Sequence, residues 1–289
     1  MIKKIVSKIL RANAHRFPKQ CIKLHYLICF KKGIDFNNIK TLNEKIQWLK
    51  LHELHKDIYT QCADKYKVRE YVRSKGCGEI LNELYGTYES VNEIDYDKLP
   101  ERFALKCNHG AGYNIICDDK NKLDRDNTNH LLSKWMKQDF SSLSVEPQYK
   151  NIERKIICEK YIENKNGGYP DDYKFYCFNG EPHAVMVCQG RENGIPKFYY
   201  FDMGWNLLPY SIDSLDAINN NYHIEKPDGF DAMKSYAKQL STDFKFVRAD
   251  FYLLNAKVLF GELTFTPSAG LDVDRLEQTD IGLGDKLDI

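Results

Sequence analysis

Two acidic residues near the C-terminal end have the type and spacing to hold a metal ion. Asp250 and Glu262 lie in a stretch whose alternation of apolar and polar residues predicts two strands joined by a turn. If Asp250 pairs with Glu262, both carboxylates and Arg248 share one face, because directly opposed side chains lie about 5 Å apart. Carboxylates at that distance repel each other unless a cation joins them. Oxygen ligands of this kind suit Mg²⁺ that also binds substrate phosphates.

The face on which Glu262 lies depends on the length of the turn. Pairing with Asp250 requires an odd number of turn residues, and we expect the turn at residues 254–256. A two-residue turn would pair Asp250 with Gly261 and move Glu262 to the other face. The alternative is a hairpin with one solvated polar face, which is common in antiparallel sheets. The hairpin alone does not decide between these interpretations.

A glycine-containing segment lies between two further predicted strands. Phe103–Cys107 is followed by the loop at residues 108–112, and a second strand covers Tyr113–Cys117. The segment is not a Walker A motif, which requires GxxxxGK[ST] leading into a helix. Glycines let backbone N–H groups approach phosphate oxygens, and Lys106 would add a positive charge. The alternative is a simple glycine hairpin.

Helices and antiparallel strands must position these residues. Thr41 and Glu44 fit a capping box at the start of a helix, and Asp64-Lys65 begin another helix that ends at Gly76. The spacing of apolar residues predicts further helices at 2–12, 127–139 and 231–240. It predicts further strands at 155–162, 172–178 and 183–188. Helices followed by antiparallel strands predict the α+β class.

Charge and cysteine usage limit the environment. The 289 residues carry a net charge of +1, which gives no sign of nucleic-acid binding. Residues 1–50 hold twelve Lys or Arg against two acids, so the remainder is net acidic. The basic helix at 2–12 either binds an anionic membrane or packs on its own domain. Nine cysteines without a CxxC pair indicate reduced thiols in a cytoplasmic protein. The sequence predicts neither a signal peptide nor a membrane span.

Several motifs occur in a fixed order and resemble a known family. They are LNEKIQWLK, ADKYKVREYV, LKCNHGAGYNIIC, EKYI, DYKFYCFNG, WNLLP, FVRADFY and GELTFTPSAG. The set covers roughly residues 40–285 and is similar to the TupA-like ATP-grasp family. The resemblance implies two α+β subdomains with largely antiparallel sheets that grip ATP. We expect a basic N-terminal helical segment at 1–40 and an ATP-grasp domain at 41–289. Within that domain, a mobile ATP-lid subdomain covers about 100–160, and a metal-binding subdomain covers about 170–289.

The resemblance also implies a reaction. Family members are ATP- and Mg²⁺-dependent ligases that join a carboxylate to an amine through an acyl phosphate. The expected substrates are a uronic-acid glycan or its precursor and an amino acid or amine, in capsule, O-antigen, teichuronopeptide or other cell-wall polysaccharide synthesis. We expect a cytoplasmic location, peripheral at the inner face of the membrane. The alternatives are a glycosyltransferase or sugar kinase of the same pathway, for which Asp272-Val273-Asp274 is a DxD match, and a non-catalytic membrane-surface adaptor.

The resemblance assigns roles to individual residues. Asp250 and Glu262 match the metal carboxylates, whereas Thr264 stands where many ATP-grasp enzymes have an Asn ligand. The catalytic cations are Arg248, Lys106 and Lys174. The nucleotide contacts are Lys65, Lys106, the loop residues His109, Gly110, Ala111 and Gly112, the hinge residues Glu159, Lys160, Tyr161 and Ile162, and the pair Asp172 and Lys174.

Overall fold

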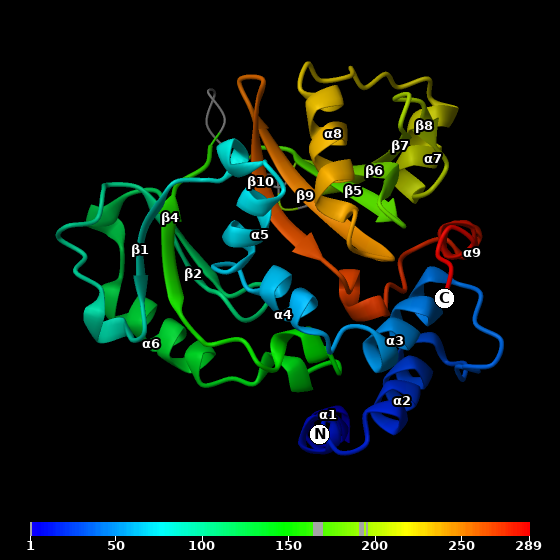
Figure 1. Cartoon of the computed structure of the whole chain (residues 1–289), viewed down its shortest axis with the longest axis horizontal. Coiled ribbons are helices and arrows are strands. Elements are labelled where there is room, and N and C mark those ends of the chain that lie inside the picture. Colours follow the sequence, from blue (N-terminus) through cyan, green and yellow to red (C-terminus); the bar gives the residue numbers. More distant parts are fainter. Residues whose placement is uncertain (1, 164–169, 191–193, 195) are drawn as a thin grey trace. The chain divides into compact units, whose positions relative to one another are not determined.

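The computed structural model describes residues 2–163, 170–190, 194 and 196–289. The chain divides into two compact units. The first unit contains Met1–His15 and Leu54–Ile162, and the second contains Arg16–Glu53 and Glu163–Ile289. Each unit has one antiparallel sheet accompanied by helices, so the α+β class is confirmed (Figure 1).

The first unit is built on a four-stranded sheet in the order β1-β4-β2-β3. Its strands are β1 (Leu84–Tyr88), β2 (Phe103–Cys107), β3 (Asn114–Cys117) and β4 (Ile156–Lys160). Its helices are α1 (Ile2–Asn13), α4 (Asp57–Ala63), α5 (Val68–Ser74) and α6 (Arg125–Met136). The apolar side chains of β2 and β4 form a core with Leu132 of α6. Lys106 is the least buried residue of β2, so its ammonium group is on the more accessible face of that strand.

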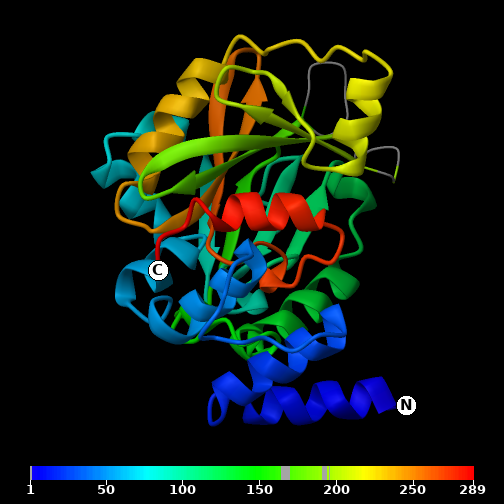
Figure 2. The ribbon, with the colours of Figure 1, turned by 90° about the vertical axis from the view of Figure 1, so that its right-hand side faces the viewer.

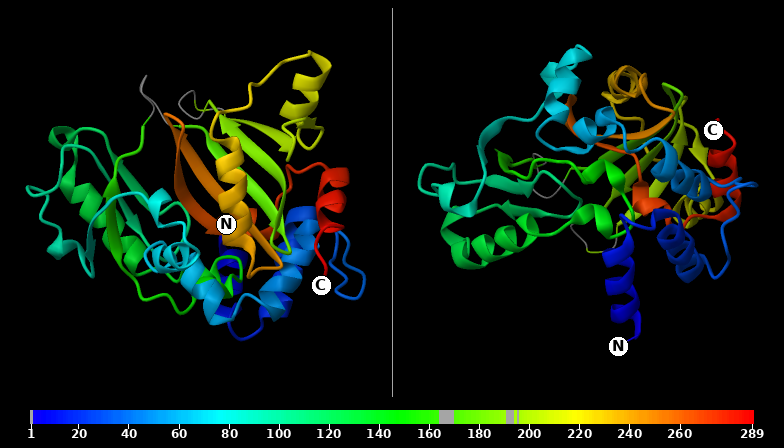
Figure 3. Two further views of the ribbon diagram at one scale, coloured as in Figure 1. Left: turned by 45° about the horizontal axis from the view of Figure 1, so that its top comes forward. Right: turned by 60° about the horizontal axis from the view of Figure 1, so that its bottom comes forward.

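The second unit is built on a six-stranded sheet in the order β10-β9-β5-β6-β7-β8. The strands are β5 (Asp172–Phe178), β6 (Glu181–Gln189), β7 (Lys197–Asp202), β8 (Leu207–Leu208), β9 (Phe246–Leu254) and β10 (Lys257–Thr264). The helices are α2 (Pro18–Phe30), α3 (Leu42–His52), α7 (Ile212–Asn219), α8 (Phe230–Ser241) and α9 (Glu277–Gly284). Helix α8 lies on one face of the sheet, where Phe230 stacks on Phe175 of β5 (Figures 1 and 3).

The capping box at the start of α3 is confirmed. The Glu44 amide donates to Thr41 Oγ1 at 3.2 Å, and the Thr41 amide donates to Glu44 Oε2 at 3.0 Å. The two bonds satisfy N–H groups that a helix start leaves unpaired. Helix α9 packs beside α3 (Figure 2), where Gly284 is so close to the Lys40 carbonyl that a Cβ would lie 2.0 Å from its oxygen.

One predicted helix boundary is wrong. The helix expected from Asp64-Lys65 begins at Val68, and residues 64–67 form a turn instead. Asp64 Oδ1 accepts N–H groups of Tyr66 and Lys67 at 2.8 and 3.2 Å, which offers the backbone a local alternative to helix. The end of this helix agrees with the prediction, since Gly76 follows it with φ of 75°.

Candidate active site

The hairpin of β9 and β10 brings Asp250 opposite Glu262, by a different route from the one predicted. The turn has two residues, Asn255 and Ala256, both with positive φ, so the expected odd-length turn is wrong. A β-bulge between Phe260 and Glu262 leaves Gly261 as an extra residue. The bulge shifts the register by one and restores the predicted Asp250–Glu262 pair.

The bulge also changes which β10 side chains face the core. Phe260 lies opposite Phe251, and their ring centroids are 6.5 Å apart. If residue 261 were paired in a regular ladder, Phe260 and Glu262 would share a face; because it is the extra residue of a bulge, the aromatic ring and the carboxylate lie on different faces. A Cβ on Gly261 would lie 2.9 Å from the Asp250 carbonyl oxygen, so the close backbone approach here requires glycine.

Six polar residues form one cluster on the sheet face opposite α8, and we call this the hairpin cluster. Its members are Asp172, Lys174, Arg248, Asp250, Glu262 and Thr264. Lys174 of β5 pairs directly with Asp250 of β9, and Lys174 Nζ lies 2.8 Å from Asp250 Oδ2. The same ammonium group lies 3.4 Å from Asp172 Oδ2. Asp172 and Lys174 are two residues apart on β5, and Lys174 pairs with Asp250, so the predicted acid–base pair faces the same side as the predicted metal carboxylates.

Arg248 binds Asp250 with two nitrogens. Nε and Nη2 donate to Oδ1 and Oδ2 at 2.8 and 2.7 Å, a fork-to-fork geometry that fixes both planes. Burial would lower the pKa of Arg248, but the adjacent Asp250 charge outweighs it and holds this pKa above its ordinary value. Arg248 therefore carries its positive charge throughout the functional pH range.

Glu262 is the most accessible of the three carboxylates in the cluster. Its side chain is 39% exposed, against 4% for Asp250. Thr264 donates its hydroxyl to Glu262 Oε1 at 3.0 Å, and Arg248 Nη2 lies 3.9 Å from the same oxygen. The threonine at the expected amide position therefore orients the glutamate.

The donor set suits Mg²⁺ in its chemistry, with one adjustment. Carboxylate and hydroxyl oxygens are ligands that Mg²⁺ prefers, and Mg²⁺ commonly binds through one or two carboxylates plus phosphates. Both oxygens of Asp250 are engaged by Arg248 and Lys174, so metal binding at Asp250 would replace one of these contacts. Among the described residues, no group of three or more His, Cys, Asp and Glu is arranged to hold a metal.

A second set of charged residues lies in the first unit. Lys106 Nζ is 2.7 Å from Glu159 Oε2, and Arg69 Nη1 is 3.4 Å from Glu159 Oε1. Arg69 also donates to the Asn82 carbonyl at 2.7 Å. We call Arg69, Lys106 and Glu159 the Glu159 triad. The sequence analysis did not predict a role for Arg69. Its position between Val68 and Val72, on the buried side of a helix, could have indicated a buried cation that needs a partner.

Lys65 is tied to the glycine loop through the backbone. Its amide donates to the Asn108 carbonyl at 3.1 Å. Asn108 is fully buried, and its side chain donates to Asp64 at 2.8 Å. The same side chain accepts from the Lys155 amide at 2.7 Å, which ties the loop to the start of β4. The chain segments that carry Lys65, Lys106 and Glu159 are thus joined around one asparagine.

The glycine loop combines a buried part with an exposed part. His109 is 2% exposed and its Nε2 lies 3.1 Å from the Trp135 carbonyl oxygen. Burial lowers the pKa of His109, which favours the neutral imidazole. A phosphate contact by this side chain stays a prediction. Gly110 packs against the Phe140 ring, where a Cβ would lie 2.6 Å away. Ala111 and Gly112 are exposed, and Gly112 has φ of 74°. Backbone contacts from this exposed end stay a prediction.

The predicted hinge follows β4. The Lys160 amide donates to the Glu83 carbonyl at 2.9 Å, and the Lys160 carbonyl accepts from Asn82 Nδ2 at 2.8 Å. The Tyr161 ring lies beneath the Arg102 guanidinium at 4.3 Å. Ile162, the last residue of the first unit, is partly buried. An adenine contact at these residues remains a prediction.

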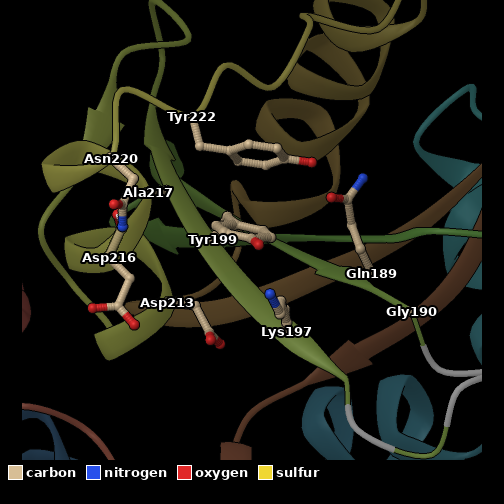
Figure 4. A pocket seen from close by; sticks show the side chains of 9 residues that line it. All are labelled: Gln189, Gly190, Lys197, Tyr199, Asp213, Asp216, Ala217, Asn220 and Tyr222. Carbon is tan, nitrogen blue, oxygen red and sulfur yellow. The ribbon is translucent and has the colours of Figure 1, made fainter.

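A pocket of about 470 Å³ lies elsewhere in the second unit (Figure 4). Gln189, Lys197 and Tyr199 line it from β6 and β7, and Tyr222 lies over Tyr199 with ring centroids 6.2 Å apart. Strand alternation puts these β6 and β7 side chains on the sheet face opposite Lys174. The pocket is therefore separate from the hairpin cluster.

Comparisons with known structures give distant matches. D-alanine–D-alanine ligase from Bacillus anthracis is 13% identical with a TM-score of 0.48, covering 78% of this chain and 63% of that one. An L-amino acid ligase from Bacillus licheniformis is 11% identical with a TM-score of 0.45, covering 73% and 44%. N5-carboxyaminoimidazole ribonucleotide synthetase in its ADP complex is 11% identical with a TM-score of 0.48, covering 82% and 53%. The chain thus spans less than two thirds of each of these proteins.

The sequence comparisons identify the family. A search of curated proteins gave no match. The family model described as TupA-like ATPgrasp matches residues 44–288, which is nearly the whole chain and includes every member of the hairpin cluster and of the Glu159 triad. The ordered motifs and the two antiparallel α+β units agree with that assignment. The chain therefore belongs to the TupA-like ATP-grasp family.

Proposed function

We propose that this protein is an ATP-dependent ligase that forms an amide between a carboxylate and an amine. The observation that carries the proposal is the hairpin cluster, in which Glu262 and Asp250 face the same side as Arg248 and Lys174. Carboxylates with two fixed cations suit phosphoryl transfer, where the protein's task is to position phosphates and neutralise charge.

The reaction has two steps. A substrate carboxylate oxygen attacks the γ-phosphorus of ATP, and the bond to the ADP oxygen breaks. The amine nitrogen then attacks the acyl carbon, phosphate leaves, and the nitrogen loses a proton to solvent or to a substrate group. ATP supplies the activation, since a free carboxylate is a poor acyl donor.

The side chains of the cluster have separate roles in this scheme. Glu262 and Asp250 would hold Mg²⁺, with Thr264 orienting Glu262. When bound, Mg²⁺ supplies charge neutralisation on the phosphates. Arg248 stabilises the charge that develops on the transferred phosphoryl group, and it holds Asp250 in place meanwhile. Lys174 neutralises Asp172 and Asp250 before the nucleotide arrives and contacts phosphate afterwards.

The first unit supplies further nucleotide contacts in this proposal. Lys106 and Lys65 bind phosphate oxygens, and the exposed end of the glycine loop, at Ala111 and Gly112, closes over them through backbone N–H groups. Glu159 and the hinge residues Lys160, Tyr161 and Ile162 contact the adenine. Water exclusion by the loop protects the acyl phosphate from hydrolysis.

The substrates follow from the family assignment. We propose a uronic-acid glycan or its precursor as the acid and an amino acid or small amine as the nucleophile, in capsule, O-antigen or cell-wall polysaccharide synthesis. We place the reaction in the cytoplasm, where ATP is abundant. The nine cysteines all lie within the described residues and form no disulfide there, which supports a reducing compartment. Membrane contact through the basic helix α1 is part of the proposal; Ile5 and Ile9 of this helix are more than half exposed.

The competing glycosyltransferase proposal is weakened by the placement of its motif. Asp272 of the DxD match forms an ion pair with Arg275 at 3.0 Å, and its backbone amide donates to Asn43 Oδ1 at 3.0 Å. Arg275 in turn binds Asp280 at 2.9 Å. Asp272 is therefore part of a structural network with α3 and α9.

The test is ADP release measured against a panel of uronic acids crossed with a panel of amino acids. We expect release that requires one acid and one amine together, and that is lost in Glu262→Gln. Release of UDP from a nucleotide sugar would instead support a transferase. A stable phosphosugar without an amine requirement would support a kinase. If the protein binds no ATP, the adaptor proposal replaces the ligase.

A further inference from the structure

Helix α2 carries an apolar surface on its outer side. Phe17, Leu24, Leu27 and Ile28 are 43, 41, 47 and 40% exposed, and we call these four residues the α2 outer face. At 100° per residue, Ile28 lies about 40° from Leu24 around the helix axis, and Leu27 lies about 60° from Leu24 on its other side. Phe17 is the N-cap residue that precedes the first turn. The exposed apolar residues of the helix therefore share one side of it, as a stripe.

The buried side of the same helix lies opposite this stripe. Ile22 and Tyr26 are each 1% exposed and contribute to the core of the second unit. The helix is thus apolar on both its inner and its outer side, whereas a surface helix of a globular protein usually presents polar residues outward. Contiguous apolar patches of this kind mark sites of interaction with a partner or a membrane.

The charges around the stripe indicate what covers it. Residues 16–34, which belong to the same unit as the stripe, contain five Lys or Arg and no Asp or Glu. Arg16, Lys19, Lys23, Lys31 and Lys32 flank the α2 outer face, and all five are exposed. The Arg16 guanidinium lies 5.1 Å from the Phe17 ring centroid, and Lys31 Nζ donates to the Ile28 carbonyl at 2.7 Å, so two of these cations lie beside the stripe itself.

We infer that the α2 outer face docks on an anionic lipid surface. Leu24, Leu27 and Ile28 can insert at the boundary between the headgroups and the acyl chains of a bilayer, and the surrounding lysines and arginines can bind the anionic headgroups. A second copy of this chain would instead bring five like charges against five at the same surface. Among the described residues no helix is long and apolar enough to span a bilayer, so the contact is one of an interfacial helix.

This inference is independent of the proposed reaction. The α2 outer face belongs to the second unit, whereas helix α1, whose membrane contact is part of the proposed function, belongs to the first. Loss of membrane docking would leave turnover of a soluble substrate unchanged. Loss of ligase activity would leave docking unchanged. An experiment that contradicts membrane docking therefore does not contradict the ligase reaction, and the reverse also holds.

Vesicle co-sedimentation tests the inference with the full chain. We expect binding to phosphatidylglycerol vesicles that falls at least tenfold in 0.5 M salt and on pure phosphatidylcholine vesicles. Leu24→Asp with Leu27→Asp should lower binding to phosphatidylglycerol by about tenfold or more, because charge would enter the stripe. The matched control is Ile212→Asp, at a residue 64% exposed on α7, which should bind as the unaltered protein does.

A fluorescent label locates the contact. Cys29 is the one exposed cysteine and the other eight are buried, so Leu24→Cys in a Cys29→Ser background gives one reactive position. An environment-sensitive dye there should shift to shorter wavelength with phosphatidylglycerol vesicles, and a dye at Ile212→Cys should not. Unchanged vesicle binding in the double Asp variant would overturn the inference. So would a dimer in sedimentation velocity that the double Asp variant dissolves, since that would assign the face to a second copy.

Discussion

The two units carry charged clusters of opposite balance. The Glu159 triad has two cations around one carboxylate, whereas the hairpin cluster has three carboxylates around two cations. The first arrangement holds one positive charge in excess and suits an anion. The second holds one negative charge in excess and suits a cation. A cluster of ion pairs at an antiparallel sheet therefore suits an anion in one unit and a cation in the other, according to which sign is in the majority.

The largest expected effect comes from removing the excess charge of the hairpin cluster. Glu262→Gln keeps the shape and the hydrogen bond from Thr264 but removes the carboxylate charge. We expect kcat for ADP release to fall by about 10²–10³, the usual cost of losing one group that stabilises charge in the transition state. Steady-state kinetics at several Mg²⁺ concentrations would check it. The side chain is 39% exposed, so the unfolding midpoint should stay within about 2 °C.

The corresponding change in the first unit should act on binding. Lys106→Met removes one of two cations and leaves Glu159 paired with Arg69. We expect the KM for ATP to rise about 10- to 100-fold, since a hydrogen bond to a charged group contributes about 1.5–3 kcal/mol. Lys155→Met is the control, because Lys155 lies at the start of β4 and pairs with Glu153 and Glu89 instead. An equal rise in both variants would contradict the contrast between the units.

A smaller effect should follow from placing a side chain at the bulge residue, Gly261. Gly261→Val places a side chain against the Asp250 backbone and should destabilise the protein by about 1–3 kcal/mol, with reduced activity as the Asp250–Glu262 pair is disturbed. In the same hairpin, Ala256→Gly relieves a non-glycine residue at φ of 62° and should stabilise by about 1 kcal/mol. Urea unfolding of both variants, with activity alongside, measures the difference. Full activity in Gly261→Val would show that the register does not depend on the bulge.

The smallest effect concerns His109 and pH. Burial lowers the pKa of this imidazole below 6.5, so the folded state stays neutral where the unfolded state takes up a proton. The free energy of unfolding should therefore fall as pH drops through about 6.5, by at most about 1.4 kcal/mol per pH unit. His109→Gln should flatten this dependence and leave the KM for ATP unchanged. A large rise in KM would mean that the side chain contacts the nucleotide after all.

The sequence suggested the pair of Asp250 and Glu262 but not the β-bulge that produces it. Alternation in 246–266 placed Asp250 and Glu262 on one face only if the turn had an odd number of residues. The turn has two residues, and the pair forms because the bulge at Gly261 restores the register. The bulge was not predictable, since a glycine inside a strand pattern also fits a regular ladder and only the Phe251–Phe260 contact selects between them. Asp64 was taken as a helix start because its side chain suits that position, whereas its tertiary bond to Asn108 holds a turn there. The burial of His109 likewise depends on Trp135, which is distant in sequence.

The extra residue at 261 has a consequence for insertions and deletions. Removing Gly261 would leave Phe260 and Glu262 as neighbours in an unbroken ladder, still opposite Phe251 and Asp250, because the bulge already places them on different faces. We therefore expect a one-residue deletion to be tolerated at this position. One residue lost between Glu262 and Thr264 would turn the threonine hydroxyl away from the carboxylate that it orients. Homologous chains should accordingly vary in length before the glutamate and keep constant length after it.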